Sequence, residues 1–272
     1  MPTIVPTSHD AGTALAARVG SGIRTPSSGL SLVTVVTVTL LAWGIATHAE
    51  VVNRSLLPSP SDVWSAALDM SRSGTLWSDI RASLTRSGVG FLVGAVSGIT
   101  VGFLTGRIAL MARLINPFVV FLRPIPVIAL VPLVTAWFGI GEDSKYLLIS
   151  YAVFLTVWLY VHDGVARTRP IYLQVSRMLG TSRLRSVVLV LAPASAPAIS
   201  VALRLGAGVA LLALVAAELG GTQSGIAYRL QVDGQFLQTD RMFVGLIVLG
   251  VLGTVTDGIL AYVSRRYIRW EA

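Results

Sequence analysis

Cysteine is absent from the 272-residue sequence, and lysine occurs only once, at Lys145. Without cysteine the protein has no disulfide framework, no thiolate nucleophile and no Cys-based metal site. The three histidines, at positions 9, 48 and 162, lie too far apart in the sequence to suggest a shared metal site. The lysine lies in the tripeptide Ser-Lys-Tyr. A Walker A loop needs Gly-Lys-Ser/Thr, so the sequence predicts no ATP site of that kind.

Charged residues are also scarce. They make up 12% of the chain, about half of the ~25% that is typical of soluble domains, while hydrophobic residues make up 54%. A water-soluble protein of this length would not cover its surface with so few charges. We therefore expect an integral membrane protein. The net charge of +8 lies mostly in short loops between apolar segments, so it indicates topology and we expect no nucleic-acid partner.

Six stretches come close to the about 20 mostly apolar residues that a membrane-spanning helix needs. They cover approximately residues 30–48, 83–106, 114–137, 145–163, 195–218 and 241–263. These runs are too long for barrel strands, and lipid offers no partner for unpaired backbone groups. We predict an all-α integral membrane protein with six transmembrane helices. Residues 1–29, which are polar, are expected to form a disordered cytoplasmic arm, and residues 30–272 the transmembrane domain.

Six spans would place both termini on the same side of the lipid bilayer. Most loop arginines lie on that side, in clusters within residues 167–185 and 265–269, whereas most acidic residues lie in the opposite loops. Because basic loops tend to stay in the cytoplasm, we expect a multi-pass protein of the cell (plasma or inner) membrane with both termini cytoplasmic.

Glycines recur every four residues in the second predicted span, at Gly90, Gly94, Gly98, Gly102 and Gly106. Small residues at this spacing let helix backbones approach closely, which in membranes replaces hydrophobic attraction. The stripe drifts by about 40° per step, which favours a neighbouring helix that crosses this one. It predicts a crowded helix contact without identifying a function.

The third predicted span contains Arg123-Pro124-Ile125-Pro126 and then Pro132. Proline removes a helix hydrogen bond and clashes with the preceding turn. Within a membrane, interrupted backbone is tolerated where it faces protein or a water-filled cavity. The segment is therefore either a kink that serves packing or part of a pathway through the membrane.

Charged side chains within or near the spans are costly in lipid, and each must face protein, water or a partner. They are Arg123, Asp163, Arg204, Glu218 and Asp257. Structural pairing is the favoured interpretation, with Asp163 and Asp257 as candidate counter-ions. Contact with a solute is the alternative, and it defines a set of candidate pathway residues: Arg123, Pro126, Arg204 and Glu218.

The loop between the fourth and fifth predicted spans, about residues 164–194, contains the clearest functional signal. Apolar residues within 171–179 predict a short amphipathic helix, and Gly180 can adopt the left-handed conformation that ends it. Ser182 can cap a second helix, which we expect Pro193 and Pro197 to limit. Two short helices that meet at a glycine would form a rigid knob suited to a groove on another protein.

This order of residues resembles the EAA loop of binding-protein-dependent ABC importer permeases. That motif has Glu-Ala-Ala, three residues, Gly, nine residues, Ile, any residue and Leu-Pro. Gly180, Val190 and Pro193 match its glycine, isoleucine and proline at the same spacing. The sequence departs from it in the opening triad, which is Gln-Val-Ser at residues 174–176, and at Ala192 in place of leucine.

Further motifs are similar to the nitrate/sulfonate/taurine branch of that family, and the resemblance covers roughly residues 56–270. These motifs are Leu-Pro-Ser-Pro at 57–60, Leu-Arg-Pro-Ile-Pro at 122–126, Ala-Leu-Val-Pro-Leu at 129–133, Trp-Phe-Gly-Ile-Gly at 137–141, Ala-Glu at 217–218, Ser-Gly-Ile at 224–226 and Phe-Leu-Gln-Thr-Asp at 236–240.

The resemblance implies a MetI-like type I ABC importer permease that forms the pathway for a small polar or anionic solute, such as a sulfonate, taurine or nitrate. Such a permease pairs with a second copy, identical or related, and receives its solute from an extracytoplasmic binding protein. It also binds two cytoplasmic ABC ATPase subunits, which hold ATP and Mg, so this chain is expected to carry no cofactor and no catalytic residue. The residues that would contact the ATPase are Gln174, Arg177, Gly180, Thr181 and Arg183.

Three other classes of protein remain as alternatives. A self-sufficient secondary transporter or channel would be expected to carry an inverted repeat or a chain of paired intramembrane carboxylates, and neither is evident. A membrane-embedded enzyme would need a His/Asp/Glu or Ser/His cluster, which three scattered histidines do not suggest. A purely structural assembly factor would leave the cytoplasmic knob without a role.

Overall fold

The computed structural model describes residues 28–49, 53 and 55–267. The predicted arm at residues 1–29 therefore lies almost entirely outside the described residues. The chain divides into two units, Met1–Pro60 and Ser61–Ala272, and each is considered by itself. Within the described residues all regular structure is helical, without strands, which confirms the predicted all-α class.

The first unit contributes the helix α2, Ser28–His48, whose apolar stretch is Thr34–His48. That stretch is shorter than the about 20 residues needed to cross a bilayer. The first predicted span is therefore a helix, but its role as a membrane span is not confirmed. After the helix, the chain is held by a hydrogen bond that the Trp43 indole donates to the carbonyl of Pro58, at 3.0 Å.

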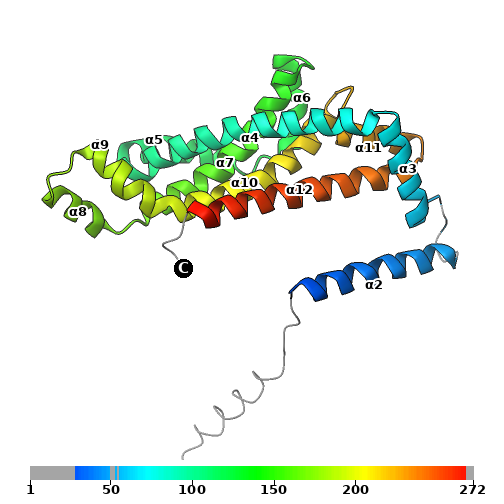
Figure 1. Ribbon diagram of the computed structural model, residues 1–272. Coiled ribbons are helices and arrows are strands. Elements are labelled where there is room, and N and C mark those ends of the chain that lie inside the picture. Colours follow the sequence, from blue (N-terminus) through cyan, green and yellow to red (C-terminus); the bar gives the residue numbers. More distant parts are fainter. Residues whose placement is uncertain (1–27, 50–52, 54, 268–272) are drawn as a thin grey trace, which may run out of the picture. The chain divides into compact units, whose positions relative to one another are not determined.

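The second unit is a helical bundle (Figure 1). Its elements are α3 (Pro60–Arg72), α4 (Thr75–Arg107), α5 (Ala109–Leu122), α6 (Val127–Phe138), α7 (Glu142–Ala166), α8 (Pro170–Met178), α9 (Arg183–Ser186), the π-helix η1 (Val187–Leu191), α10 (Ala192–Leu219), α11 (Ile226–Gln235) and α12 (Thr239–Tyr267). We call the end of the bundle that carries α8 and α9 the loop end. The helices α3 and α11 lie at the opposite end (Figure 1).

Four helical segments are long and apolar enough to cross a membrane. They are Thr75–Arg107, Glu142–Ala166, Val187–Leu219 and Thr239–Arg266, and they coincide with the second, fourth, fifth and sixth predicted spans. The third predicted span differs, because α5 and α6 are bent by 101° at the break between them. In Figure 1, α6 leaves the bundle at this break. The described residues thus contain four spans, or five if the bent pair counts as one.

The glycine stripe of α4 packs against α7, which confirms the predicted close contact between helices. A Cβ atom added at Gly94 would lie 2.6 Å from the carbonyl oxygen of Ser150 and 2.7 Å from Cβ of Val153. The other stripe glycines meet Ile149, Val157, Val161 and Val165 in the same way. The pairing advances by four residues on both helices, so α4 and α7 run parallel and stay in contact at five successive positions.

The core of the bundle surrounds α7 and α10. Leu148, Ile149, Val153, Val157 and Leu214 are at most 1% exposed, and partners from α4 and α6 pack around them. The helix α12 contributes few buried side chains and presents most of its apolar residues outwards. A helix that is apolar on its outer face is stable in lipid, and the bundle therefore presents a lipid-compatible flank.

Candidate coupling and pathway sites

The predicted end of the first loop helix at Gly180 is confirmed. The helix α8 stops at Met178, and Gly180 has φ +71°, a conformation that side chains other than glycine rarely adopt. The amide of Thr181 donates to the carbonyl of Ser176 at 3.1 Å, which is the bond that closes a Schellman C-cap. The direction in which the chain leaves α8 is therefore fixed by backbone geometry at one glycine.

Three hydroxyl side chains hold the two short helices of the loop together. The Ser176 hydroxyl lies 2.7 Å from the Thr181 hydroxyl and 2.7 Å from the Ser186 hydroxyl, and Thr181 also donates to the Ser176 carbonyl. Ser176 and Ser186 are buried, at 5% and 6% exposed. The loop is thus a preorganised unit, as a rigid coupling element requires.

The prediction that Pro193 and Pro197 limit the second loop helix was wrong. Ser182 does cap α9, through its hydroxyl and the amide of Arg185 at 3.4 Å, but the helix then continues through η1 into α10. Pro193 lies in the first turn of α10, where its missing N–H costs little. The π-turn before it, in which the Ala192 amide bonds to the carbonyl of Val187, shifts the hydrogen-bond register so that the chain stays helical.

The five predicted coupling residues all lie on or next to this loop unit. Gln174 and Gly180 are exposed, and Thr181 is half-buried by its bonds to Ser176. Arg177 lies on α8 and Arg183 begins α9, but their side chains fall outside the described ones.

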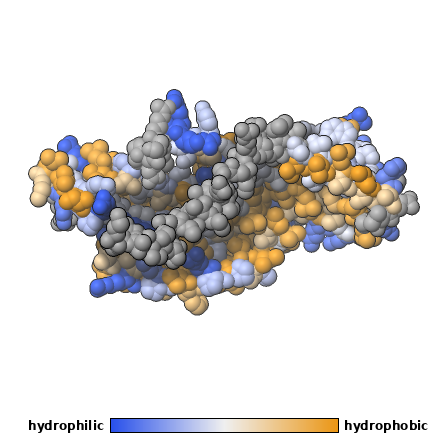
Figure 2. Space-filling model, turned by 90° about the horizontal axis from the view of Figure 1, so that it is seen from below, coloured by the Kyte–Doolittle hydropathy of each residue, from blue (hydrophilic) through white to orange (hydrophobic). Residues whose placement is uncertain are grey.

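The most exposed part of the loop is apolar, as expected for a knob that fits a groove on another protein. Met178 is 87% exposed and Leu179 is 79% exposed. Figure 2 shows hydrophobic residues at this tip of the molecule, where α8 and α9 lie. Exposed apolar side chains on a rigid unit favour a protein partner.

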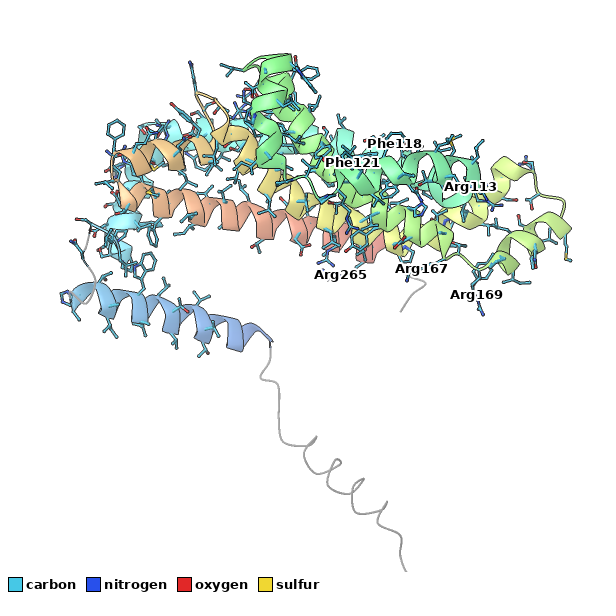
Figure 3. All side chains as sticks on the ribbon, turned by 180° about the vertical axis from the view of Figure 1, so that it is seen from behind. Arg113, Phe118, Phe121, Arg167, Arg169 and Arg265 are labelled. Atoms are coloured by element: carbon cyan, nitrogen blue, oxygen red, sulfur yellow. The ribbon has the colours of Figure 1, made fainter. Side chains whose placement is uncertain are left out.

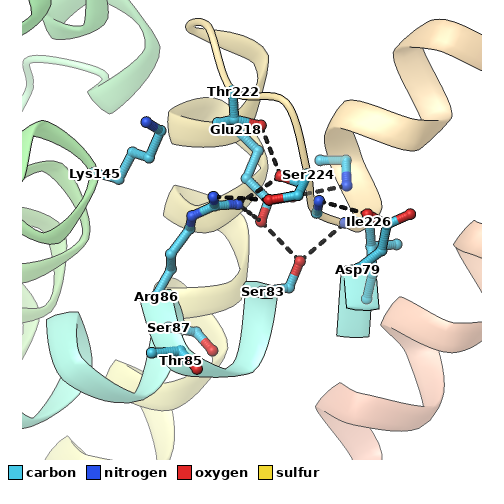
Figure 4. A network of polar contacts seen from close by, with 12 residues as sticks. Asp79, Ser83, Thr85, Arg86, Ser87, Lys145, Glu218, Thr222, Ser224 and Ile226 are labelled. Carbon is cyan, nitrogen blue, oxygen red and sulfur yellow. Dashed lines mark hydrogen bonds and ion pairs between the residues drawn. The ribbon is translucent and has the colours of Figure 1, made fainter. Parts of the chain in front are cut away.

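A buried charge cluster joins four helices at the opposite end of the bundle (Figure 4). Arg86 of α4 donates two bonds of 2.7 Å to the carboxylate of Glu142, which begins α7. The same guanidinium donates to Glu218 of α10 at 3.0 Å and to the carbonyl of Ser224 at 2.6 Å. Arg86 is 4% exposed and Glu218 is fully buried. A buried charge is tolerated only when it is paired and hydrogen-bonded, and these contacts meet that condition.

The same cluster caps the N-terminus of α11 with side chains from other helices. The amide of Gly225 donates to Asp79, that of Ile226 to Ser83, and that of Ala227 to Glu218, each at 2.9 Å. Gly225 has φ +120°, and a Cβ there would lie within 2.5 Å of the Glu218 carboxylate. Carboxylates at a helix N-terminus also meet the positive end of the helix dipole, so the cluster fixes α11 onto the bundle.

Glu218 was a candidate pathway residue, and the structure encloses it instead. Its carboxylate accepts bonds from Ser83, Arg86 and the backbone of Ala227, and none of its surface is exposed. The sequence reasoning missed Arg86, although Asp79, Ser83 and Arg86 share one face of α4 at positions i, i+4 and i+7. These three polar residues on one face of an otherwise apolar helix were the sequence feature from which the charge cluster could have been predicted.

Arg204, another candidate pathway residue, pairs with Asp257, which confirms one of the two predicted counter-ions. Its Nε and Nη2 atoms each lie 2.9 Å from a carboxylate oxygen of Asp257, so α10 and α12 are joined by a bidentate ion pair. The pair is about half exposed on the surface of the bundle. The other candidate, Asp163, instead lies 3.8 Å from the guanidinium of Arg167, which follows the last residue of α7.

Arg123 and Pro126 lie at the break between α5 and α6. Arg123 follows the last residue of α5, and Pro126 precedes the first residue of α6 with extended backbone at φ −68° and ψ 137°. The carbonyl of Leu122 accepts a hydrogen bond of 3.1 Å from the Ile125 amide within the break and a second one of 2.7 Å from the Tyr151 hydroxyl of α7. Arg123 and Pro126 both line a cavity of about 430 Å³.

Charges are distributed unevenly between the two ends of the bundle. Figure 3 shows Arg113, Arg167, Arg169 and Arg265 together at the loop end. At the opposite end Asp233 of α11 is buried, and its Oδ2 has no hydrogen-bond partner within the described part of the chain. Burial raises the pKa of the Asp233 carboxyl above its ordinary value, and nearby arginines only partly oppose that shift.

Comparison with known proteins places this arrangement in a family. The family described as binding-protein-dependent transport system inner membrane component matches residues 94–269. The taurine transport system permease protein TauC of Escherichia coli (strain K12) is 32% identical over 247 residues, which cover 89% of this chain and 90% of TauC. A second relative is SsuC of Bacillus subtilis (strain 168), which is named as a permease protein for aliphatic sulfonates transport. It is 32% identical to this chain over an aligned region that covers 86% of this chain and 85% of SsuC.

The fold is also similar to a solved structure. A chain of the MetNI methionine ABC transporter, in an inward-facing conformation, superposes with a TM-score of 0.59 at 20% identity, covering 70% of this chain and 96% of that one. At that identity the likeness supports the fold alone, and the fold is the predicted MetI-like one. On the extent of the family match and of these relatives, the chain belongs to the binding-protein-dependent transport system inner membrane components, the permease subunits of ABC transporters.

Proposed function

We propose that the chain forms the membrane pathway of an ATP-driven importer for a sulfonate- or taurine-like solute. Its family consists of membrane components, with ATP hydrolysis in separate subunits. The names of TauC and SsuC support the class of solute. The partners in this proposal are an ABC ATPase pair that holds ATP and Mg, an extracytoplasmic binding protein, and a second permease copy, taken here as identical.

The observation that carries the proposal is the rigid unit at the loop end. The left-handed turn at Gly180 and the Ser176 bonds hold α8 and α9 in one orientation. Met178 and Leu179 project from that unit as exposed apolar side chains. In the proposed complex this unit is the coupling helix that sits in a cleft of the ATPase, with Gln174, Arg177, Thr181 and Arg183 around it. Closure of the ATPase pair would then move the loop unit and, through the continuous helix η1–α10, the spanning helices.

The orientation in the membrane follows the distribution of charge. We place the loop end, with its arginines, in the cytoplasm and the end that carries α11 outside. The C-terminal end of α12 lies with the loop end (Figure 1), so the C-terminus is assigned to the cytoplasm.

A crosslinking experiment tests the coupling role. Because the sequence contains no native cysteine, a thiol reagent reacts only with an introduced cysteine. Met178→Cys carries a single thiol at the tip of the loop unit. We expect a short thiol-reactive photocrosslinker at this position to join the chain to the Walker-motif ATPase that co-purifies with it. The matched control is Leu246→Cys, which is 55% exposed on α12 and lies among its apolar residues. Equal crosslinking at both positions, or none at Met178→Cys, would contradict the proposal.

Accessibility labelling tests the orientation separately. Met178→Cys should react with an impermeant thiol reagent only after the membrane is opened, whereas Gln235→Cys, exposed at the end of α11, should react in intact cells or spheroplasts. Labelling of both from the same side would contradict the topology.

A further inference from the structure

Two adjoining cavities lie at the break between α5 and α6, against α7 and α10. The larger has a volume of about 430 Å³, and its polar lining includes Arg123, Tyr151, Thr156 and Tyr160. This volume falls within the range of about 300–1,000 Å³ that is typical of small-molecule sites. No aspartate or glutamate is among the described residues that line it. The lining therefore offers positive charge and hydroxyl groups without a negative charge.

Arg123 is the unusual member of this lining. Within the described part of the chain its guanidinium has no ion-pair or hydrogen-bond partner, whereas Arg86 and Arg204 are both bound by carboxylates. It follows the 14 residues of α5, so it lies about 20 Å from the loop end of that helix. Arg123 is exposed at the break of this bent helix pair. Because an unpaired guanidinium is costly against lipid, we expect it to face water or a bound group.

The polar groups around Arg123 differ in whether their hydrogen-bond donors are already used within the protein. The Tyr151 hydroxyl already donates to the Leu122 carbonyl, and the Thr156 hydroxyl donates to the Ala152 carbonyl. The guanidinium has five N–H donors, and Tyr160 has a further hydroxyl. Free donors thus predominate, which suits an oxygen-rich anion. A ligand ammonium would lie in this cavity without a carboxylate to pair with, at a large desolvation cost.

The second cavity, of about 350 Å³, continues the first. The two share Pro126, Val127, Ala152 and Val209 in their linings. Beyond these, the second is lined by aliphatic side chains of α6 and α10, which are Ile128, Leu212, Ala213, Val215, Ala216 and Leu219. The combined space therefore has a cationic end and an apolar end. A molecule with an anionic head and a short alkyl chain matches both ends.

We propose that these cavities are a transmembrane binding site for aliphatic sulfonates, with the sulfonate oxygens at Arg123 and the alkyl chain toward Leu212. The site discriminates against taurine, because taurine carries an ammonium group where the second cavity is apolar. This inference rests on the proposed function, which it deepens by naming the preferred solute and the residue that recognises it.

Binding to the full chain in nanodiscs of zwitterionic phosphatidylcholine tests the site, because that lipid removes anionic headgroups as competing ligands. Isothermal titration with 1-butanesulfonate should show saturable binding, and taurine should bind at least about tenfold more weakly. Arg123→Gln should raise the Kd for butanesulfonate by about tenfold or more, since a charge-assisted contact is lost. The matched control is Arg113→Gln, an exposed arginine of α5 outside both cavities, which should leave the Kd unchanged.

Two further variants keep the test valid if Arg123→Gln does not fold. Tyr160→Phe should weaken butanesulfonate binding, because it removes one hydroxyl donor and no volume. Leu212→Trp should narrow the apolar end and weaken butanesulfonate more than methanesulfonate, whose carbon chain is too short to reach it. Three results would each overturn the site. The first is equal binding of taurine and butanesulfonate, and the second is an unchanged Kd for butanesulfonate in all three variants. The third is the absence of any butanesulfonate binding to the wild-type chain.

Uptake assays separate this inference from the proposed function. If the complete transporter takes up butanesulfonate with ATP and Arg123→Gln leaves the KM unchanged, the site is wrong and the proposed function stands. If butanesulfonate binds in an Arg123-dependent way but no ATP-driven uptake occurs with any ATPase partner, the proposed function is wrong and the site stands.

Discussion

Replacing one glycine of the stripe on α4 should loosen the central helix pair of the bundle. In Gly94→Ala the new Cβ would lie 2.6 Å from the Ser150 carbonyl oxygen, whereas ordinary contacts begin near 3.4 Å. The α4 and α7 backbones would have to separate locally by about 0.8 Å, and overpacking of this kind costs about 1–3 kcal/mol. The neighbour on that side is backbone, so no side chain can rotate away to relieve the strain.

Gly88→Ala is the matched control on the same helix. A Cβ at Gly88 would meet nothing within 4 Å, so only the better helix propensity of alanine, about 0.5–1 kcal/mol, should appear. The two variants should therefore differ by about 1–3 kcal/mol in the free energy of unfolding, which corresponds to a difference in Tm on the order of 5 °C. The measurement is thermal unfolding of each purified chain in identical lipid nanodiscs.

The result that would refute this reasoning is a Gly94→Ala chain at least as stable as Gly88→Ala. In that case α4 and α7 would not approach as closely as the structure has them, and the packing of the bundle would need a different explanation.

Three other variants probe separate contacts. Gly164→Ala should destabilise the chain by about 1–3 kcal/mol, because its Cβ would lie 2.3 Å from Cβ of Ala198; adding Ala198→Gly should restore stability, and additive effects in the double-mutant cycle would argue against the contact. Glu218→Gln leaves Arg86 short of one buried countercharge and should cost about 3–5 kcal/mol in an unfolding titration; a loss below ~1 kcal/mol would show that the cluster is not structural. Burial raises the pKa of Asp233, so the stability that this carboxyl supports is present below its unfolded pKa of about 4 and is lost as pH rises through the raised folded pKa. Asp233→Asn should therefore be more stable than wild type at pH 7 but not at pH 4. Equal differences in Tm between variant and wild type at both pH values would exclude this explanation.

The glycine stripe illustrates what the sequence could predict. Its spacing of four residues indicated a close neighbour, and the neighbour carries a matching repeat of β-branched residues, Ile149, Val153, Val157, Val161 and Val165. Both patterns are local and periodic, so they can be recognised without knowledge of the fold. The stripe was expected to favour a crossing helix, but the two repeats keep pace with each other, so the helices remain in contact along their length.

The loop unit was predictable for a similar reason, since the left-handed turn at Gly180 and the cap at Ser182 depend on residues close in sequence. The continuation of α9 into α10 was not predictable, because proline usually ends a helix. Here the π-turn before Pro193 absorbs the change in hydrogen bonding.

The charge cluster and the cavities could not be predicted from the sequence, because they depend on tertiary contacts. Arg86 meets Glu142 and Glu218 only when three helices converge, 56 and 132 residues apart in sequence. The prolines near Arg123 indicated an interrupted span, but the bend of 101° and the open space beside it follow from the packing of α6 against α7 and α10. Sequence reasoning therefore found Arg123 without finding its surroundings.

The central claim is that this chain transports its solute only when an ATPase acts on the loop unit. The most direct test is uptake of a radiolabelled alkanesulfonate into proteoliposomes that contain the chain, its co-purified ATPase and its binding protein. Uptake should require ATP. It should be lost in Gly180→Val, because a β-branched residue disfavours the left-handed turn that φ +71° requires. Uptake by the chain alone without ATP, or normal uptake by Gly180→Val, would contradict the account.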